Sequence, residues 1–125
     1  MNIPSDLKYT KEHEWIKIEG DNASIGITDY AQGELGDVVF VELPSVGSEV
    51  KATDTFGTIE AVKAVSDLFA PVTGEVVAVN EKLEDDPMVI NRDPYGDGWM
   101  IKVKVKDNSE LESLLSPDDY SSLVE

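Results

Sequence analysis

The chain has 125 residues, no cysteine, one histidine, and 26 acidic against 10 basic side chains, which gives a formal net charge of -16. The missing cysteines exclude a disulfide framework, a thiolate zinc site and a cysteine nucleophile, and one histidine excludes a multi-histidine metal cage. The acidity argues against nucleic acid and against an anionic membrane, because both bind clustered Lys and Arg. We therefore expect no metal site, and partners with basic protein surfaces.

The length fits one domain, residues 1–125, with a single hydrophobic core. No stretch is long and apolar enough to predict a membrane span, and residues 1–10 lack the basic start and apolar run of a signal peptide. We expect a soluble, intracellular monomer, in the cytoplasm if its source is bacterial and in the mitochondrial matrix, with its transit peptide removed, if its source is eukaryotic.

Three strands are predicted in the first third of the chain. Residues 15–19 and 23–27 carry isoleucines at alternate positions, and Gly20-Asp21-Asn22 between them is typical of a hairpin turn. Residues 38–43 form a β-branched and aromatic run that ends at Pro44. Such a run predicts a largely buried strand.

Short helices are predicted between and after the strands. Thr28 is suited to cap a helix over residues 29–35, and Gly36 stands where helices often end. Near the C-terminus three leucines recur at helical spacing, and a serine cap, a first-turn proline and two acids follow. These residues are Leu111, Leu114 and Leu115, then Ser116-Pro117-Asp118-Asp119.

The clearest strand pattern covers residues 99–106. Apolar residues alternate there with Met100 and three lysines, which gives one apolar face and one mostly basic face. We expect the lysines to face solvent and to protect an edge strand from unwanted pairing. A short echo between residues 47–50 and 74–77 further indicates two similar strand units about an approximate two-fold axis, with Lys63 in the segment between them.

Lys63 is the residue that could carry chemistry. It lies between two strand-like runs, beside the small apolar residues Ala61, Val62, Ala64 and Val65, and no Gly, Asn or Pro stands at this tip to form a tight turn. An exposed lysine has a pKa near 10.4 and is a poor nucleophile at neutral pH, so it is better suited to enzymatic acylation than to catalysis. On spacing alone, an unmodified surface lysine is the simpler interpretation.

Seven segments, spread over nearly the whole chain, match one known family in order. They are residues 7–9, 12–15, 26–32, 35–44, 60–64, 70–76 and 94–102. Around the lysine the motif reads Glu60-Ala61-Val62-Lys63-Ala64, and the last segment includes Pro94-Tyr95-Gly96-Asp97-Gly98-Trp99. In these segments the chain resembles the H proteins of the glycine cleavage system.

This resemblance implies a mainly β fold of the lipoyl/biotinyl type. Such a fold is a barrel-sandwich hybrid of two small antiparallel sheets, with the modified lysine at a hairpin tip and short helices, including C-terminal ones. The chain departs from the family at two places. Ala61 stands where a serine is frequent before the Val-Lys pair, and Thr53-Asp54 stands where a Gly-Asp or Gly-Glu turn is frequent.

The resemblance also implies that Lys63 is joined by an amide to lipoic acid, and that the chain is a carrier and not an enzyme. In the family's cycle a pyridoxal-phosphate glycine decarboxylase places an aminomethyl group on the arm. An aminomethyltransferase passes its methylene to tetrahydrofolate, and dihydrolipoamide dehydrogenase reoxidises the dithiol. Lipoyl-attaching enzymes load the lysine, so the reactive sulfur that the sequence lacks arrives with the cofactor.

The aminomethyl-loaded arm is labile and positively charged, so it needs shelter and a counter-charge. The resemblance implies that the arm folds into a cleft, where Glu14 and Asp67 would meet the ammonium group. In a chain with 26 acids, a solvated surface acid is the simpler interpretation of each. His13 is expected to be a surface or capping residue and is given no role.

Four alternatives remain open. A biotin carrier would have methionines beside the lysine, where this chain has Val62 and Ala64. A 2-oxoacid dehydrogenase lipoyl domain usually has an Asp before its lysine and a flexible linker after the domain. An H-like protein that relays lipoyl groups to other enzymes would use the same lysine. A small enzyme with paired carboxylates, such as Glu12 with Glu14, belongs to a different class of function.

Overall fold

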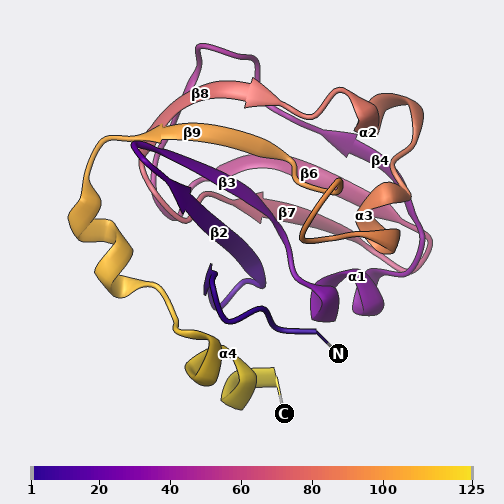
Figure 1. Ribbon diagram of the computed structural model, residues 1–125. Helices are drawn as coiled ribbons and strands as arrows, with labels where there is room; N and C mark the ends of the chain where they lie inside the picture. Colours follow the sequence, from indigo (N-terminus) through magenta and orange to yellow (C-terminus); the bar gives the residue numbers. More distant parts are fainter. Residues whose placement is uncertain (1, 125) are drawn as a thin grey trace.

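Two antiparallel sheets, surrounded by short helices, make up the computed structural model, which describes residues 2–124 (Figure 1). The larger sheet has the strand order β1-β2-β3-β9-β8-β5, and the smaller sheet has the order β4-β6-β7. The strands are β1 (Lys8–Tyr9), β2 (Glu14–Glu19), β3 (Asn22–Ile27), β4 (Val38–Glu42), β5 (Glu49–Val50), β6 (Thr55–Ala61), β7 (Val65–Phe69), β8 (Gly74–Val79) and β9 (Ile101–Val105). The mainly β fold with two antiparallel sheets is confirmed.

The helices are short and connect or follow the strands. They are α1 (Asp29–Leu35), α2 (Lys82–Asp85), α3 (Val89–Arg92), the 3-10 helix η1 (Asn108–Ser113) and α4 (Pro117–Val124). Thr28 caps α1 by accepting a hydrogen bond from the Ala31 amide at 3.2 Å, and Gly36 ends it with a φ of 79°. Ser116 caps α4 through the amide of Asp119. The predicted helix starts are confirmed. The predicted helical repeat of leucines is wrong: Leu111 lies in a 3-10 helix, and Leu114 and Leu115 lie between η1 and α4, where Leu115 forms a β-bridge with Tyr9.

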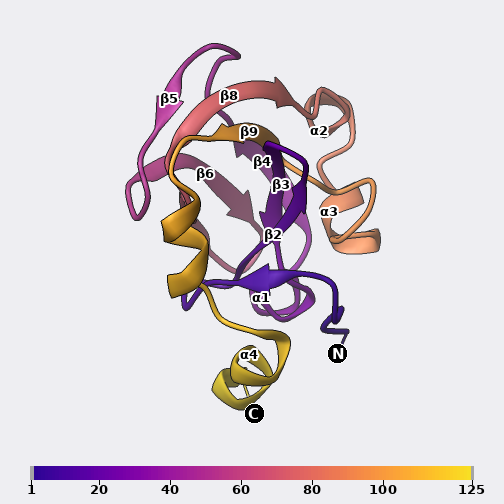
Figure 2. The same ribbon diagram turned by 60° about the vertical axis from the view of Figure 1, so that its left-hand side comes forward.

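The core lies between the two sheets, with a smaller cluster beside it. Ile25, Ile59 and Val76 are among the fully buried residues of the main cluster. In the smaller cluster the rings of Tyr9 on β1 and Tyr120 on α4 stack with their centroids 4.7 Å apart. Because apolar contact stabilises packed elements, this cluster holds the C-terminal helix against β1 (Figure 2).

The prediction of a largely buried strand at residues 38–43 is wrong for most of β4. Only Val38 is buried, whereas the Val39 and Phe40 side chains are 55% and 52% exposed. The physical reason is a bulge: Val38 pairs with Ala61 and Phe40 pairs with Glu60, so Val39 is an extra residue. The bulge breaks the alternation of faces that a regular strand would have.

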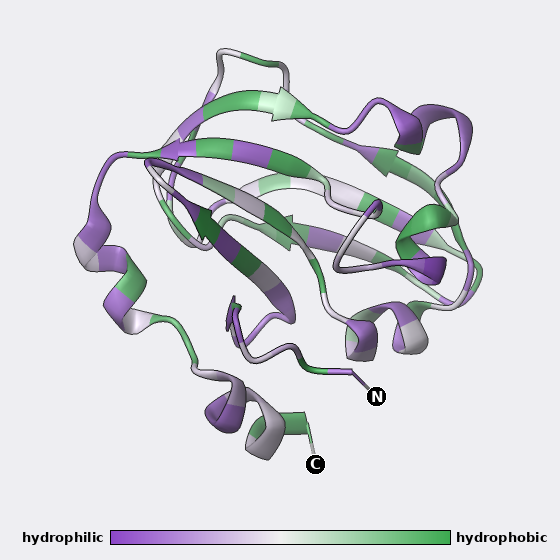
Figure 3. Ribbon diagram, in the orientation of Figure 1, coloured by the Kyte–Doolittle hydropathy of each residue, from purple (hydrophilic) through white to green (hydrophobic). Residues whose placement is uncertain are grey.

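The prediction of an edge position for the lysine-rich strand is also wrong. β9 pairs with β3 on one side and β8 on the other, so it lies inside the larger sheet. Its alternating pattern is visible as bands of apolar and hydrophilic residues (Figure 3), with Ile101 and Val103 buried. The echo segments pair directly with each other, because Glu49 of β5 lies opposite Glu75 of β8.

Thr53 has a left-handed backbone, with a φ of 74°, in the turn where members of the family that the sequence resembles often have glycine. A β-branched residue is strained in this region, and glycine is not. We expect Thr53→Gly to raise the free energy of unfolding by about 0.5–1 kcal/mol, since relief of strain exceeds the added entropy of the unfolded chain. Urea denaturation measures this. Thr55→Gly, in the extended strand β6, should instead lower the free energy of unfolding. If both variants lose the same free energy of unfolding, the backbone of Thr53 is not strained.

Candidate functional site

Lys63 lies at the tip of the hairpin that joins β6 to β7. The strands pair up to Glu60 and Val65, and the Ala61 amide donates to the Ala64 carbonyl at 2.9 Å, which leaves Val62 and Lys63 as the turn. His13 and Thr53 are the non-glycine residues with positive φ among those described, so this turn is formed without left-handed residues. The predicted hairpin-tip position of Lys63 is confirmed.

The turn is held by the chain that leaves α1. The Lys63 amide donates to the Leu35 carbonyl and the Val62 amide donates to the Asp37 carbonyl, each at 3.1 Å. Gly36 lies between them, and a Cβ built on it would stand 3.0 Å from a Val62 methyl. Docking on α1 therefore replaces the turn residues that the sequence lacks, and it leaves the lysine side chain exposed.

Asn91 on α3 fixes the segment on which the hairpin rests. Its side-chain Nδ2 donates to the Gly36 carbonyl at 2.8 Å and to Gln32 Oε1 at 3.0 Å, and its Oδ1 accepts from the Val38 amide at 2.9 Å. One side chain thus satisfies backbone groups on both sides of Asp37. This network positions the Lys63 turn relative to the body of the protein.

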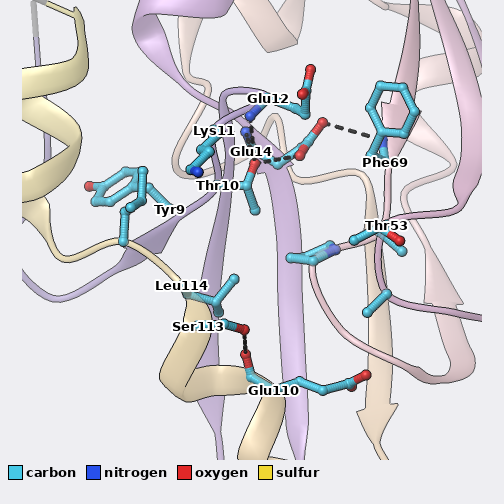
Figure 4. A pocket seen from close by; sticks show the side chains of 14 residues that line it. Tyr9, Thr10, Lys11, Glu12, Glu14, Thr53, Phe69, Glu110, Ser113 and Leu114 are labelled. Atoms are coloured by element: carbon cyan, nitrogen blue, oxygen red, sulfur yellow. Dashed lines mark hydrogen bonds between the residues drawn. The ribbon is translucent and has the colours of Figure 1, made fainter.

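Glu14 is a buried carboxylate between the two sheets. It begins β2 and is 2% exposed, with Oε1 accepting from Thr10 Oγ1 at 2.5 Å and Oε2 accepting from the Phe69 amide at 3.2 Å (Figure 4). Burial raises the pKa of Glu14 to about 7, although both hydrogen bonds act to lower it. A carboxyl with such a pKa changes charge in response to a nearby cation.

Two cavities meet at Glu14. The larger, of about 560 Å³, lies between β1, the Ala52-Thr53 turn and the residues at and after η1, and it has mostly apolar walls (Figure 4). The smaller, of about 310 Å³, extends toward α1 and β7 and is lined by both Glu14 and Asp67. Leu35, whose carbonyl holds the Lys63 turn, also lines the smaller cavity.

The structure therefore brings both predicted acids to one cavity beside the lysine turn. Glu14 lies deep in the protein, whereas Asp67 is exposed on the edge strand β7. The rest of the wall is mixed: it has apolar residues such as Ile27, Ile59 and Leu68, and two further carboxylates, Glu12 and Glu34. Within residues 2–124, no group of three or more His, Asp or Glu side chains is arranged to hold a metal ion.

His13 is a wall residue of the smaller cavity that the sequence did not predict. Its Nδ1 lies 2.9 Å from the Tyr120 hydroxyl, which is 2.6 Å from Thr28 Oγ1, and its ring lies 4.8 Å from that of Tyr30. Burial lowers the pKa of His13. His13 thus connects α4 to the start of α1, and its left-handed φ of 69° turns the chain into β2.

No helix in the described part of the chain is long and apolar enough to cross a membrane. The chain is similar in sequence to curated bacterial proteins. The glycine cleavage system H protein of Carboxydothermus hydrogenoformans is 58% identical over 123 residues, covering 98% of this chain and 95% of its own length. That of Staphylococcus haemolyticus is 57% identical over 124 residues, covering 99% and 98%.

A solved structure and a family model agree with these relatives. The crystal structure of a glycine cleavage system H protein from Mycobacterium marinum superposes with a TM-score of 0.85 at 43% identity, covering 96% of this chain and 97% of that one. The model described as glycine cleavage H-protein matches residues 7–125. On this match and these identities, the chain belongs to the glycine cleavage H-protein family.

Proposed function

We propose that this chain is the lipoyl carrier of a glycine cleavage system and that Lys63 is its attachment residue. Membership of the H-protein family supports the carrier role. The exposed position of Lys63 on an anchored turn is the observation that supports the residue. As a carrier, the chain takes the aminomethyl group of glycine from the pyridoxal-phosphate decarboxylase to the tetrahydrofolate-dependent aminomethyltransferase, and presents its dithiol to dihydrolipoamide dehydrogenase.

The residues around Lys63 fit a lipoyl group. Among the described residues, the Lys63 amine makes one long hydrogen bond, 3.5 Å to the Gly33 carbonyl, so little holds it away from an acylating enzyme. The smaller cavity offers apolar side chains for a hydrocarbon arm and four carboxylates for an ammonium group, those of Glu12, Glu14, Glu34 and Asp67. When attached, the lipoyl group supplies the reactive sulfurs, which a chain without cysteine cannot provide.

The two predicted acids, Glu14 and Asp67, have different tasks in this proposal. Asp67 at the exposed edge would attract an ammonium group to the cavity, and Glu14 would hold it in a site from which water is largely excluded. A buried cation favours the charged form of a neighbouring carboxyl, so Glu14 would ionise as the cation enters. Before a cation enters, hydrogen bonds from the Thr10 hydroxyl and the Phe69 amide hold the Glu14 carboxyl group in its orientation.

The chain itself performs no chemistry in this proposal. Its residues present Lys63, shelter the arm and offer an acidic surface to the partner enzymes, while the decarboxylase, the aminomethyltransferase and the dehydrogenase own the active sites. The bacterial origin of the relatives supports a carrier that works in a bacterial cytoplasm.

Reconstitution tests the proposal. The chain is expressed with lipoate and with a lipoate-attaching enzyme, combined with the three partner enzymes, and assayed for release of carbon dioxide from labelled glycine. The lipoylated chain should support turnover, and the unmodified chain should not. Turnover with the unmodified chain, or none with a fully lipoylated one, would contradict the carrier role.

A further inference from the structure

Four exposed apolar side chains lie around Lys63 on the smaller sheet. Val62 and Val65 flank the lysine and are each 68% exposed, and Val39 and Phe40 of β4 are 55% and 52% exposed. We name these four residues the tip patch. Isolated exposed apolar residues are common, but several gathered at one place are typical of a site of protein contact.

Strand pairing places the tip patch on the outer face of the smaller sheet. Phe40 pairs with Glu60 and Glu60 pairs with Val65, so the side chains of these three residues form one row across β4, β6 and β7. The next residue of β6, Ile59, points the opposite way and is 1% exposed in the core. Val62 is brought beside β4 by the hydrogen bond from its amide to the Asp37 carbonyl.

The β4 bulge creates this surface. Without the extra residue Val39, a regular strand would alternate and would turn only every second apolar side chain outward. The bulge instead exposes Val39 and Phe40 together. Two large apolar side chains exposed side by side are unfavourable in water, and a partner protein that covers them removes this cost. The exposed pair therefore points to an interface.

The charges around the tip patch restrict the partner. Glu60 is exposed between Phe40 and Val65, and Asp37 and Glu42 are exposed beside the tip patch. These three acids form no ion pair among residues 2–124, and Lys63 is the cation at the tip. A complementary protein surface therefore has apolar groups opposite the tip patch and Lys or Arg opposite these acids. Attraction between these charges also favours rapid association at low salt.

We propose that the tip patch is the docking surface for the enzyme that acylates Lys63. This inference rests on the proposed function. The acylating enzyme must bring the lysine amine itself into its active site, so it approaches within the length of one lysine side chain. Enzymes that act on the far end of a long lipoyl arm can stand further from the turn. The tip patch is thus placed to be covered during attachment.

Steady-state lipoylation by a lipoate–protein ligase tests the surface. Phe40→Asp and Val65→Asp each replace an apolar side chain of the tip patch with a negative charge beside Glu60. Val46→Asp is the matched control, since Val46 is 59% exposed in the β4–β5 connection. We expect about a tenfold or greater rise in KM for the first two and little change for the control. Urea midpoints check folding, and acetylation of Lys63 by acetic anhydride checks that the amine is equally accessible in all variants.

The outcomes separate this inference from the proposed function. If Phe40→Asp and Val65→Asp raise KM no more than Val46→Asp does, the docking surface alone is overturned, provided that the wild-type chain is lipoylated. A wild-type chain that accepts no lipoyl group from an active ligase would overturn both. Sedimentation that shows a dimer which Phe40→Asp separates would assign the tip patch to a second copy of the chain, and would also overturn the inference.

Discussion

Lys63→Arg is expected to abolish both the lipoyl mass increment and glycine cleavage in the reconstituted system. Arginine keeps the positive charge and the length of the side chain, but its guanidinium stays protonated and does not accept an acyl group as an amine does. The turn itself should be unaffected, because it is held by backbone hydrogen bonds to Leu35 and Asp37. Intact-mass measurement and release of labelled carbon dioxide check the two losses.

The matched control for this variant is Lys51→Arg, at another exposed lysine. It should keep the lipoyl increment and full turnover, and the urea midpoints of both variants should equal that of the wild type. A lipoyl increment or glycine cleavage that survives Lys63→Arg would remove the carrier role from this residue.

Glu14→Gln is expected to flatten the pH dependence of stability. The pKa of Glu14 is about 7 in the folded protein, above its ordinary value of 4.5, so folding binds a proton. The stability that this proton provides is complete below pH 4.5 and is lost as the pH rises to 7, with a total of about 3 kcal/mol from the two values. The glutamine amide can still accept from Phe69 and donate to Thr10 without titrating. Urea unfolding between pH 4 and 8 measures both proteins.

Glu12→Gln is the control for this effect, since Glu12 is an exposed neighbour that lines the same cavities. It should retain most of the wild-type decline with pH, because burial, and not the charge of Glu12, is the largest cause of the raised pKa of Glu14. A Glu14→Gln protein with the same decline would contradict the buried charge. The Glu14→Gln variant should also lose the aminomethyl group faster after loading, because its neutral amide offers no counter-charge to the ammonium group.

Much of the proposed attachment site could be predicted from the sequence because it depends on local pattern. Two strand-like runs around a lysine place Lys63 at a turn, and the motif from Glu60 to Ala64 identifies its family. The support of the turn could not be predicted in the same way. It depends on carbonyls of Leu35 and Asp37, and on Asn91 more than fifty residues further along, which only the tertiary fold brings together.

The two acids show a similar division. Glu14 and Asp67 could be chosen as candidates from the sequence, but their different environments could not, because the exposed Asp67 has the more apolar sequence neighbours. Glu14 is buried where Thr10, just after β1, and the Phe69 amide of β7 supply its hydrogen bonds. The place of His13 in the cavity wall could not be predicted, since it depends on contact with Tyr120 near the C-terminus.

The errors in the predicted strands have physical causes. Apolar composition indicates burial only where side chains alternate regularly, and the bulge at Val39 breaks that alternation in β4. A lysine face indicates a solvated surface, but it does not distinguish an edge strand from a central one. β9 is central, with its lysine face solvated in part and Lys102 lying over the ring of Trp99.

Peptide mapping of the chain after lipoylation tests the central claim most directly. Trypsin does not cut after an acylated lysine, so the account predicts a single lipoylated peptide that runs uncut through Lys63, from Ala52 to Lys82. The other lysines should be cleaved and carry no lipoyl group. A lipoyl group on any other lysine, or normal cleavage at Lys63 in a chain that has gained the lipoyl mass, would contradict the account.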